Sequence, residues 1–185
     1  MTIDLKTVML VSTMVNFICA CAIAIIWYQN RKRFAGLTFW LAYMILLTTG
    51  TTLVILRGMV PDFFSIVLAN AMVIAGIVTI YMGLERFVGK KSSQIHNYVL
   101  LGIFIVVHAY YTHVEPILLA RSLNFSVATM IFTFQCCWLL LRRVDSSMRR
   151  ITFTVGIVFG CYVVASFARI ILLTLSPPQS SDFFK

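Results

Sequence analysis

Six apolar segments, separated by short polar connections, dominate the pattern of hydrophobic and polar residues along the chain. Each segment is close to the roughly 20 residues that an α-helix needs to cross the hydrocarbon core of a bilayer. The connections carry charged residues together with Gly or Pro, which interrupt helices. The predicted helices cover residues 7–28, 37–56, 63–84, 95–112, 118–141 and 151–175. The pattern therefore predicts an all-α, polytopic bundle of about six transmembrane helices.

The composition leads to the same class of protein. Hydrophobic residues make up 61% of the chain and charged residues 11%, and the mean hydropathy is +0.95. Soluble domains are about 45–50% apolar and about 25% charged. These values exclude a soluble globular domain, a disordered chain and a secreted disulfide scaffold. Six helices and their connections occupy nearly the whole length, so we expect one transmembrane domain over residues 1–185 and no soluble domain.

The net charge of +9 is distributed unevenly along the chain. Ten of the 15 basic residues fall in the first, third and fifth connections: Arg31, Lys32, Arg33, Arg86, Lys90, Lys91, Arg142, Arg143, Arg149 and Arg150. Lys and Arg accumulate in cytoplasmic loops of membrane proteins. The lipid bilayer accounts for this charge without a nucleic-acid partner. The asymmetry predicts that the N-terminus lies outside and that the first segment is a retained helix rather than a signal peptide.

Polar residues gather at the predicted outer ends of the helices. Arg169 and Asn70 lie about 9 and about 10 Å inside their segments by helical rise. Such groups are costly in hydrocarbon and often functional, and Arg suits an anionic group. We expect an outward-facing cleft for a small ligand, formed by Arg57, Asn70, His108, Tyr111, Glu115, Arg121 and Arg169. In the alternative interpretation, Arg169 reaches the outer interface and Asn70 bonds to a neighbouring helix.

Other residue patterns give weaker indications. Gly156 and Gly160 form a G-x-x-x-G spacing, which lets helices approach closely either within the bundle or in a dimer. The five cysteines lie within predicted helices without C-x-x-C spacing, and the three histidines do not form a metal-ligand pattern. We therefore expect no metal and no cofactor, with a single-haem protein as an alternative. The chain has no catalytic motif of its own.

An ordered set of landmarks extends over nearly the whole chain. It includes Gly36, Trp40, Gly50, Leu56-Arg57, Pro61, the run SIVLAN at 65–70, Gly76, the run YMGLERF at 81–87, Tyr111-Thr112, Pro116, Arg121, Arg142, Arg149, Arg169, Pro177-Pro178 and Asp182-Phe183-Phe184. This set resembles the membrane-embedded N-terminal sensory or input module of bacterial diguanylate cyclases, the GGDEF-type signalling proteins.

The resemblance implies a specific context for the chain. A seventh helix would follow residue 185 and lead into a cytoplasmic GGDEF domain, in a homodimer in the bacterial inner membrane. The chain itself lacks the GG(D/E)EF motif, so we expect the input fragment of a longer enzyme, regulating cyclic di-GMP signalling in response to an unknown small ligand or to the state of the membrane. A small solute transporter or channel is the alternative, as is a structural subunit. Polar residues become sparse in the predicted inner half, which favours a closed-ended cleft over a pore.

Overall fold

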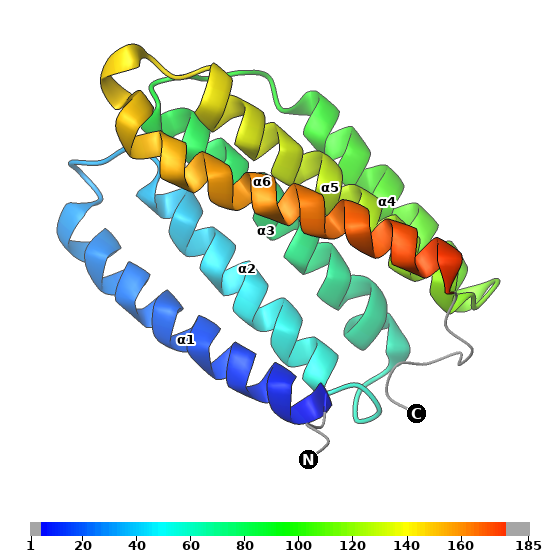
Figure 1. Ribbon diagram of the computed structural model, residues 1–185. Helices are drawn as coiled ribbons and strands as arrows, with labels where there is room; N and C mark the ends of the chain where they lie inside the picture. Colours follow the sequence, from blue (N-terminus) through cyan, green and yellow to red (C-terminus); the bar gives the residue numbers. More distant parts are fainter. Residues whose placement is uncertain (1–4, 177–185) are drawn as a thin grey trace.

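The computed structural model describes residues 5–176, except for the side chains of residues 5, 6 and 147 (Figure 1). This range is helical, apart from its connections and an isolated bridge between Arg57 and Val60. The elements are α1 (Leu5–Asn30), α2 (Leu37–Ile55), η1 (Phe63–Leu68), α3 (Ala69–Phe87), α4 (Ile95–His113), α5 (Leu118–Arg142) and α6 (Ser146–Leu175). Since η1 continues into α3, the described residues form six spans, each long and apolar enough to cross a membrane. The prediction of a six-helix membrane bundle is confirmed.

The helix boundaries lie close to the predicted ones, with one larger difference at the start of α6. This helix begins at Ser146, whereas the apolar pattern predicted a start near residue 151. Its first turns contain Arg149 and Arg150, which are exposed. Hydrophobicity marks only the part of a helix that lies in hydrocarbon, so it does not detect polar turns that extend beyond it.

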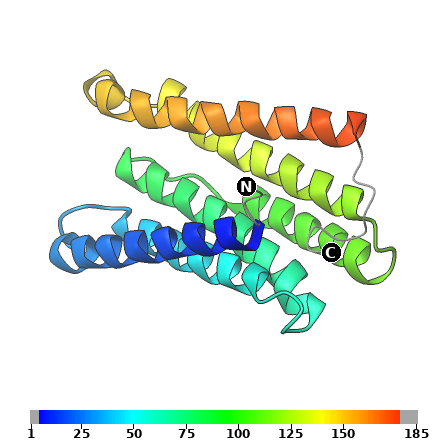
Figure 2. The same ribbon diagram turned by 60° about the horizontal axis from the view of Figure 1, so that its bottom comes forward.

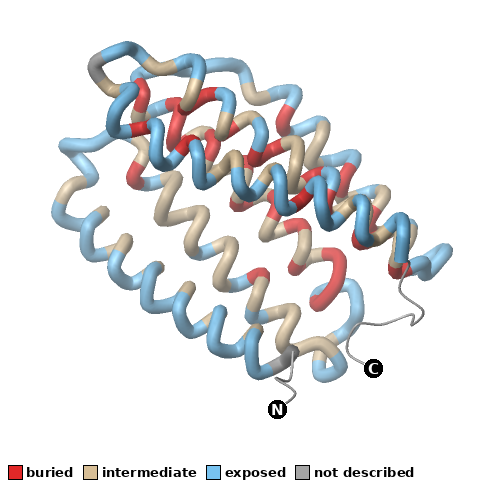
Figure 3. The backbone as a smooth tube through the Cα atoms, in the orientation of Figure 1, coloured by how far each residue is buried: buried red, intermediate tan, exposed pale blue. Residues whose placement is uncertain are grey.

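The bundle has a central pair of helices and two peripheral ones. Helix α3 packs against α2, α4 and α5, and α5 packs against α3, α4 and α6. Among the described helices, α1 packs against α2 alone and α6 against α5 alone, and the two lie apart in both ribbon views (Figures 1 and 2). Buried residues accordingly concentrate along α3 and α5, while α1 is mostly exposed (Figure 3).

The core follows the contact between α3 and α5. One cluster contains Ile74 and Val78 of α3 with Phe132 of α5, and a second joins Tyr81 and Leu84 to Leu139 and neighbouring residues. The exposed surfaces of α1 and α6 are themselves rich in large apolar side chains, such as Phe17 and Phe167. An apolar exterior over a buried core is what a bilayer requires of a helical bundle.

Close approach of α2 and α3 depends on glycine. Gly36 precedes α2 with a φ of 101°, and a Cβ atom built there would lie 2.5 Å from the backbone oxygen of Gly83. A Cβ atom on Gly83 would in turn lie 2.6 Å from Trp40. These contacts leave no room for a side chain at either position.

We name the two ends of the bundle by their residues. The basic end contains connections 31–36, 88–94 and 143–145, and the cavity end contains connections 56–62 and 114–117. Helix α1 begins and α6 ends at the cavity end.

Candidate functional site

A cavity of about 510 Å³ lies at the cavity end, and every helix of the bundle contributes to it. Its polar lining consists of Arg57, Arg121, Arg169, Asn70, His108, Ser65, Ser122 and Thr51. Its apolar lining consists of Met9, Val54, Ile66, Val73, Leu118 and Phe125. The volume falls within the range of about 300–1,000 Å³ that small-molecule sites occupy.

Three arginines reach the cavity from three separate segments. Arg57 follows α2 in a tight turn, in which its amide donates to Val54 and Gly58 adopts a φ of 88°. Arg121 lies in the first turn of α5 and is buried. Arg169 lies in the last third of α6, with its guanidinium carbon 5.9 Å from the centre of the Phe125 ring. The described residues that line the cavity include these three arginines and no Asp or Glu, so this part of the lining is cationic.

The π-helical turn η1 forms the cavity wall next to α3. Pro61 fixes the start of this turn: its carbonyl accepts hydrogen bonds from the amides of Phe64 and Ser65. The Asn70 side-chain amide donates to the Ile66 carbonyl over 2.6 Å, and the Ala69 backbone amide donates to the same carbonyl. Single π-turns are frequent at functional sites, and this one places Ser65, Ile66 and Asn70 on the cavity lining.

His108 has unused hydrogen-bonding capacity. Its side chain is 2% exposed, and within the described part of the chain neither ring nitrogen has a hydrogen-bond partner. The imidazole packs against Phe104 with ring centres 5.1 Å apart and lines the cavity. Buried polar groups are normally hydrogen-bonded, so this imidazole is suited to bind a polar group inside the cavity.

The structure brings together five of the seven candidate residues, namely Arg57, Asn70, His108, Arg121 and Arg169. The other two lie outside the cavity lining. Tyr111 packs its ring edge-on against Tyr110, and Glu115 is exposed in the connection to α5. Both residues lie near the cavity end of the bundle. Side chains at the same level of a helix point in different directions, so the position along the helix does not predict which of them reach the cavity. Ligand binding by the other five residues stays a prediction.

Gly156 and Gly160 lie against α5 of the same chain. A Cβ atom on Gly156 would lie 2.7 Å from Cδ2 of Leu141, and one on Gly160 would lie 3.5 Å from Sγ of Cys137. Nearby, the Thr152 hydroxyl donates to the Leu140 carbonyl over 3.3 Å. These contacts lie within the bundle, and a role of the glycine pair in a dimer stays a prediction.

A buried carboxylate at the basic end was not singled out from the sequence. Glu85 is 4% exposed and accepts hydrogen bonds from Tyr81 (3.1 Å), Ser92 (2.5 Å) and Gln94 (2.6 Å). Gln94 in turn accepts a hydrogen bond from the buried Asn97 over 2.7 Å. The signals in the sequence were Tyr81 four residues before Glu85 and the polar run that follows Lys91.

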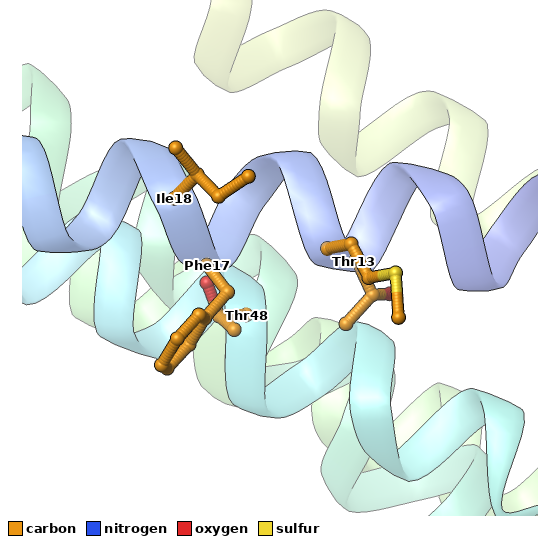
Figure 4. Close-up of a pocket in the computed structure, with 5 residues that line it drawn as sticks. Thr13, Phe17, Ile18 and Thr48 are labelled. Carbon is orange, nitrogen blue, oxygen red and sulfur yellow. The ribbon is translucent and has the colours of Figure 1, made fainter.

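A second hollow lies between α1 and α2 and has a different character. It measures about 390 Å³ and is lined by Thr13, Met14, Phe17, Ile18 and Thr48 (Figure 4). With no charged residue in its lining, it offers no means of holding a charged group.

No group of three or more His, Cys, Asp or Glu side chains in the described part of the chain could hold a metal ion. Comparison with protein-family models, with curated proteins and with solved structures found no match. The fold and the cavity define a class, a helical membrane protein with a cationic cavity at one end.

Proposed function

We propose that the chain is a membrane-embedded sensory module that binds a ligand with an anionic group in the cavity. The observation that carries this proposal is the convergence of Arg57, Arg121 and Arg169 on a lining with no Asp or Glu among its described residues. Guanidinium groups bind carboxylates and phosphates bidentately, so three of them on one lining suit an anionic group.

The proposed orientation follows the distribution of charge. The basic end carries the arginine and lysine residues that the positive-inside rule assigns to the cytoplasm. The cavity end would then lie on the outer side of the bacterial cytoplasmic membrane. A reporter fused after Gln94 should give a cytoplasmic signal, and one inserted after Glu115 an extracytoplasmic one. The opposite pair of signals would overturn the orientation and leave anion binding to be tested by itself.

Signal transmission would use α6. This helix packs on α5 alone among the described helices, yet it places Arg169 on the cavity. An anion held by Arg169 and by Arg121 of α5 would favour one packing of α6 over another, which is what a ligand-driven population shift requires. The sequence resemblance supports a cytoplasmic diguanylate cyclase as the output, working as a homodimer.

Titration calorimetry on the protein in lipid nanodiscs tests the binding step. The panel contains carboxylates and phosphates with and without an apolar chain. Arg169→Gln should weaken binding about tenfold to a hundredfold, the range for one charge-assisted hydrogen-bonded contact. The matched control is Arg150→Gln, because Arg150 is exposed on the same helix about 28 Å away by helical rise. Absence of binding by the whole panel would overturn the proposal, as would equal losses in the two variants.

The output is tested with the complete reading frame of the natural gene, expressed in cells that lack other diguanylate cyclases. A bound anion should change the cyclic di-GMP level, and Arg169→Gln should remove the change. If the unmodified protein never alters cyclic di-GMP, the proposed output is wrong, whatever the calorimetry gives.

A further inference from the structure

Helices α1 and α6 both contribute to the cavity without packing against each other. Both Met9 of α1 and Arg169 of α6 line it, yet no Cα atom of α1 lies within 8 Å of one in α6. Packed helices have axes about 8–10 Å apart, so α1 and α6 are not packed against each other. Figures 1 and 2 show the two helices apart, on different sides of the bundle. A ligand chain that passed between them would meet lipid, because the outer faces of both helices carry exposed apolar side chains.

The charged lining lies near the helix ends at the cavity end. Arg121 is in the first turn of α5, and Arg169 is six residues before the last residue of α6. By helical rise these positions are about one to two turns, roughly 5–9 Å, inside the helix ends. Amphipathic groups insert about 5–10 Å at the boundary between headgroups and acyl chains, so a membrane surface at these helix ends would bring the arginines within reach of a headgroup.

The lining combines two kinds of surface. The guanidinium groups and the imidazole of His108 suit a charged oxygen-bearing group, whereas Met9, Val54 and Phe125 suit an apolar one. His108 adds an independent indication, because its side chain is nine-tenths buried or more and its ring nitrogens have no hydrogen-bond partner within residues 5–176. A small hydrophilic anion would leave the apolar part of this lining without a matching group.

We infer that the ligand is an amphiphilic anion, with one carboxylate or phosphate headgroup and a single apolar chain, that enters from the bilayer between α1 and α6. This inference rests on the proposed anion-binding function and adds the class of ligand and its route. The headgroup is held by the arginines and His108, and the chain leaves the cavity past Met9 toward lipid. Inorganic phosphate or a short carboxylate shares the headgroup chemistry, so the test has to distinguish binding through the anionic group from binding through the apolar chain.

The contributions of the headgroup and of the apolar chain are measured by displacement of a fluorescent dodecanoate analogue from the protein in nanodiscs. Empty nanodiscs correct for partition of each compound into lipid. Dodecanoate and dodecyl phosphate should displace the probe at a mole fraction in lipid at least tenfold lower than dodecanol, which has the same chain without the charge. Acetate and inorganic phosphate should displace less than a tenth of the probe at a millimolar concentration.

The outcomes separate the two proposals. Binding of acetate or phosphate that depends on Arg169, with no advantage for the chain-bearing anions, overturns the amphiphile and leaves the anion receptor in place. Equal displacement by dodecanol and dodecanoate overturns both, since charge recognition is then absent. Displacement by the chain-bearing anions alone, reduced at least tenfold by Arg169→Gln, is the expected result.

The route between the helices is tested by filling the α1 side of the opening. Met9→Trp should slow the association of dodecanoate at least fivefold, because the larger ring occupies the cavity mouth. Val8→Trp is the matched control, since Val8 is the neighbouring residue, is 50% exposed and does not line the cavity. Equal association rates in the two variants and the unmodified protein would overturn the proposed route.

Discussion

The side-chain amide of Gln94 donates a hydrogen bond of 2.6 Å to the carboxylate of Glu85, which joins the last turns of α3 to the start of α4. The same carboxylate accepts from Tyr81 within α3 and from Ser92 in the connection. A buried carboxylate is retained when donors of this kind surround it. One side chain of α3 therefore holds the second half of the connection 88–94.

Glu85→Ala should destabilise the protein by about 3 kcal/mol, because three donors lose their acceptor at a buried site. The expected readout is a lower unfolding midpoint in detergent. Glu115→Ala serves as the control, since Glu115 is exposed and should give a change within about 0.5 kcal/mol. Equal stability of the two variants would mean that the Glu85 hydrogen bonds add nothing to the folded state.

Alanine variants of Gly36 and Gly58 distinguish the free-energy cost of backbone strain from the cost of close packing between helices. Both have positive φ angles, 101° and 88°, but only Gly36 approaches another helix, where an added Cβ atom would meet the Gly83 oxygen at 2.5 Å. Gly58→Ala should cost about 1–2 kcal/mol, the strain alone. Gly36→Ala should cost at least twice as much, measured as loss of unfolding free energy in the same detergent. A smaller loss for Gly36→Ala than for Gly58→Ala would contradict the tight contact between α2 and α3.

The position of Gly156 predicts which kind of packing a larger side chain disrupts. Gly156→Ile should lower the unfolding midpoint of the single chain, because the side chain meets Leu140 and Leu141 of α5. The control is Gly102→Ile, since an added Cβ atom at Gly102 has nothing within 4 Å. If Gly156→Ile left the midpoint unchanged and only altered the mass measured by light scattering, Gly156 would belong to a contact between chains.

The helices were predictable because the signal that defines them is simple. Runs of apolar residues, broken at places such as Pro61 and the basic stretch after Trp27, gave the six spans. The polar turns before Ile151 were missed, since they lie outside the apolar run that the prediction used. The π-turn at Phe63–Leu68 was missed as well, because its apolar sequence differs in no way from that of an ordinary helix.

The sequence predicted how far along each helix the candidate residues lie, and it predicted only partly toward which side their side chains point. Arg57, Asn70, His108, Arg121 and Arg169 share a level near one end of the bundle, and the structure shows that they share a cavity. Helices that are apolar on all sides do not indicate which side faces a neighbour, so Tyr111 could not be separated from His108. The Glu85 hydrogen bonds depend on how a connection folds back onto a helix, which no local pattern specifies.

Substitution of His108 should change the stability of the protein and its affinity for the anion in opposite directions. A buried imidazole without hydrogen-bond partners destabilises a protein by about 1–3 kcal/mol relative to an apolar group of similar shape. His108→Phe should therefore raise the unfolding midpoint by the equivalent of about 1 kcal/mol, helped by contact with the Phe104 ring. The same variant should bind the chain-bearing anion at least tenfold more weakly, measured by displacement in nanodiscs. His96→Phe is the control, because His96 is exposed at the start of α4 and should change neither quantity. A variant at position 108 that lost stability and kept its affinity would show that the imidazole serves the fold and not the cavity.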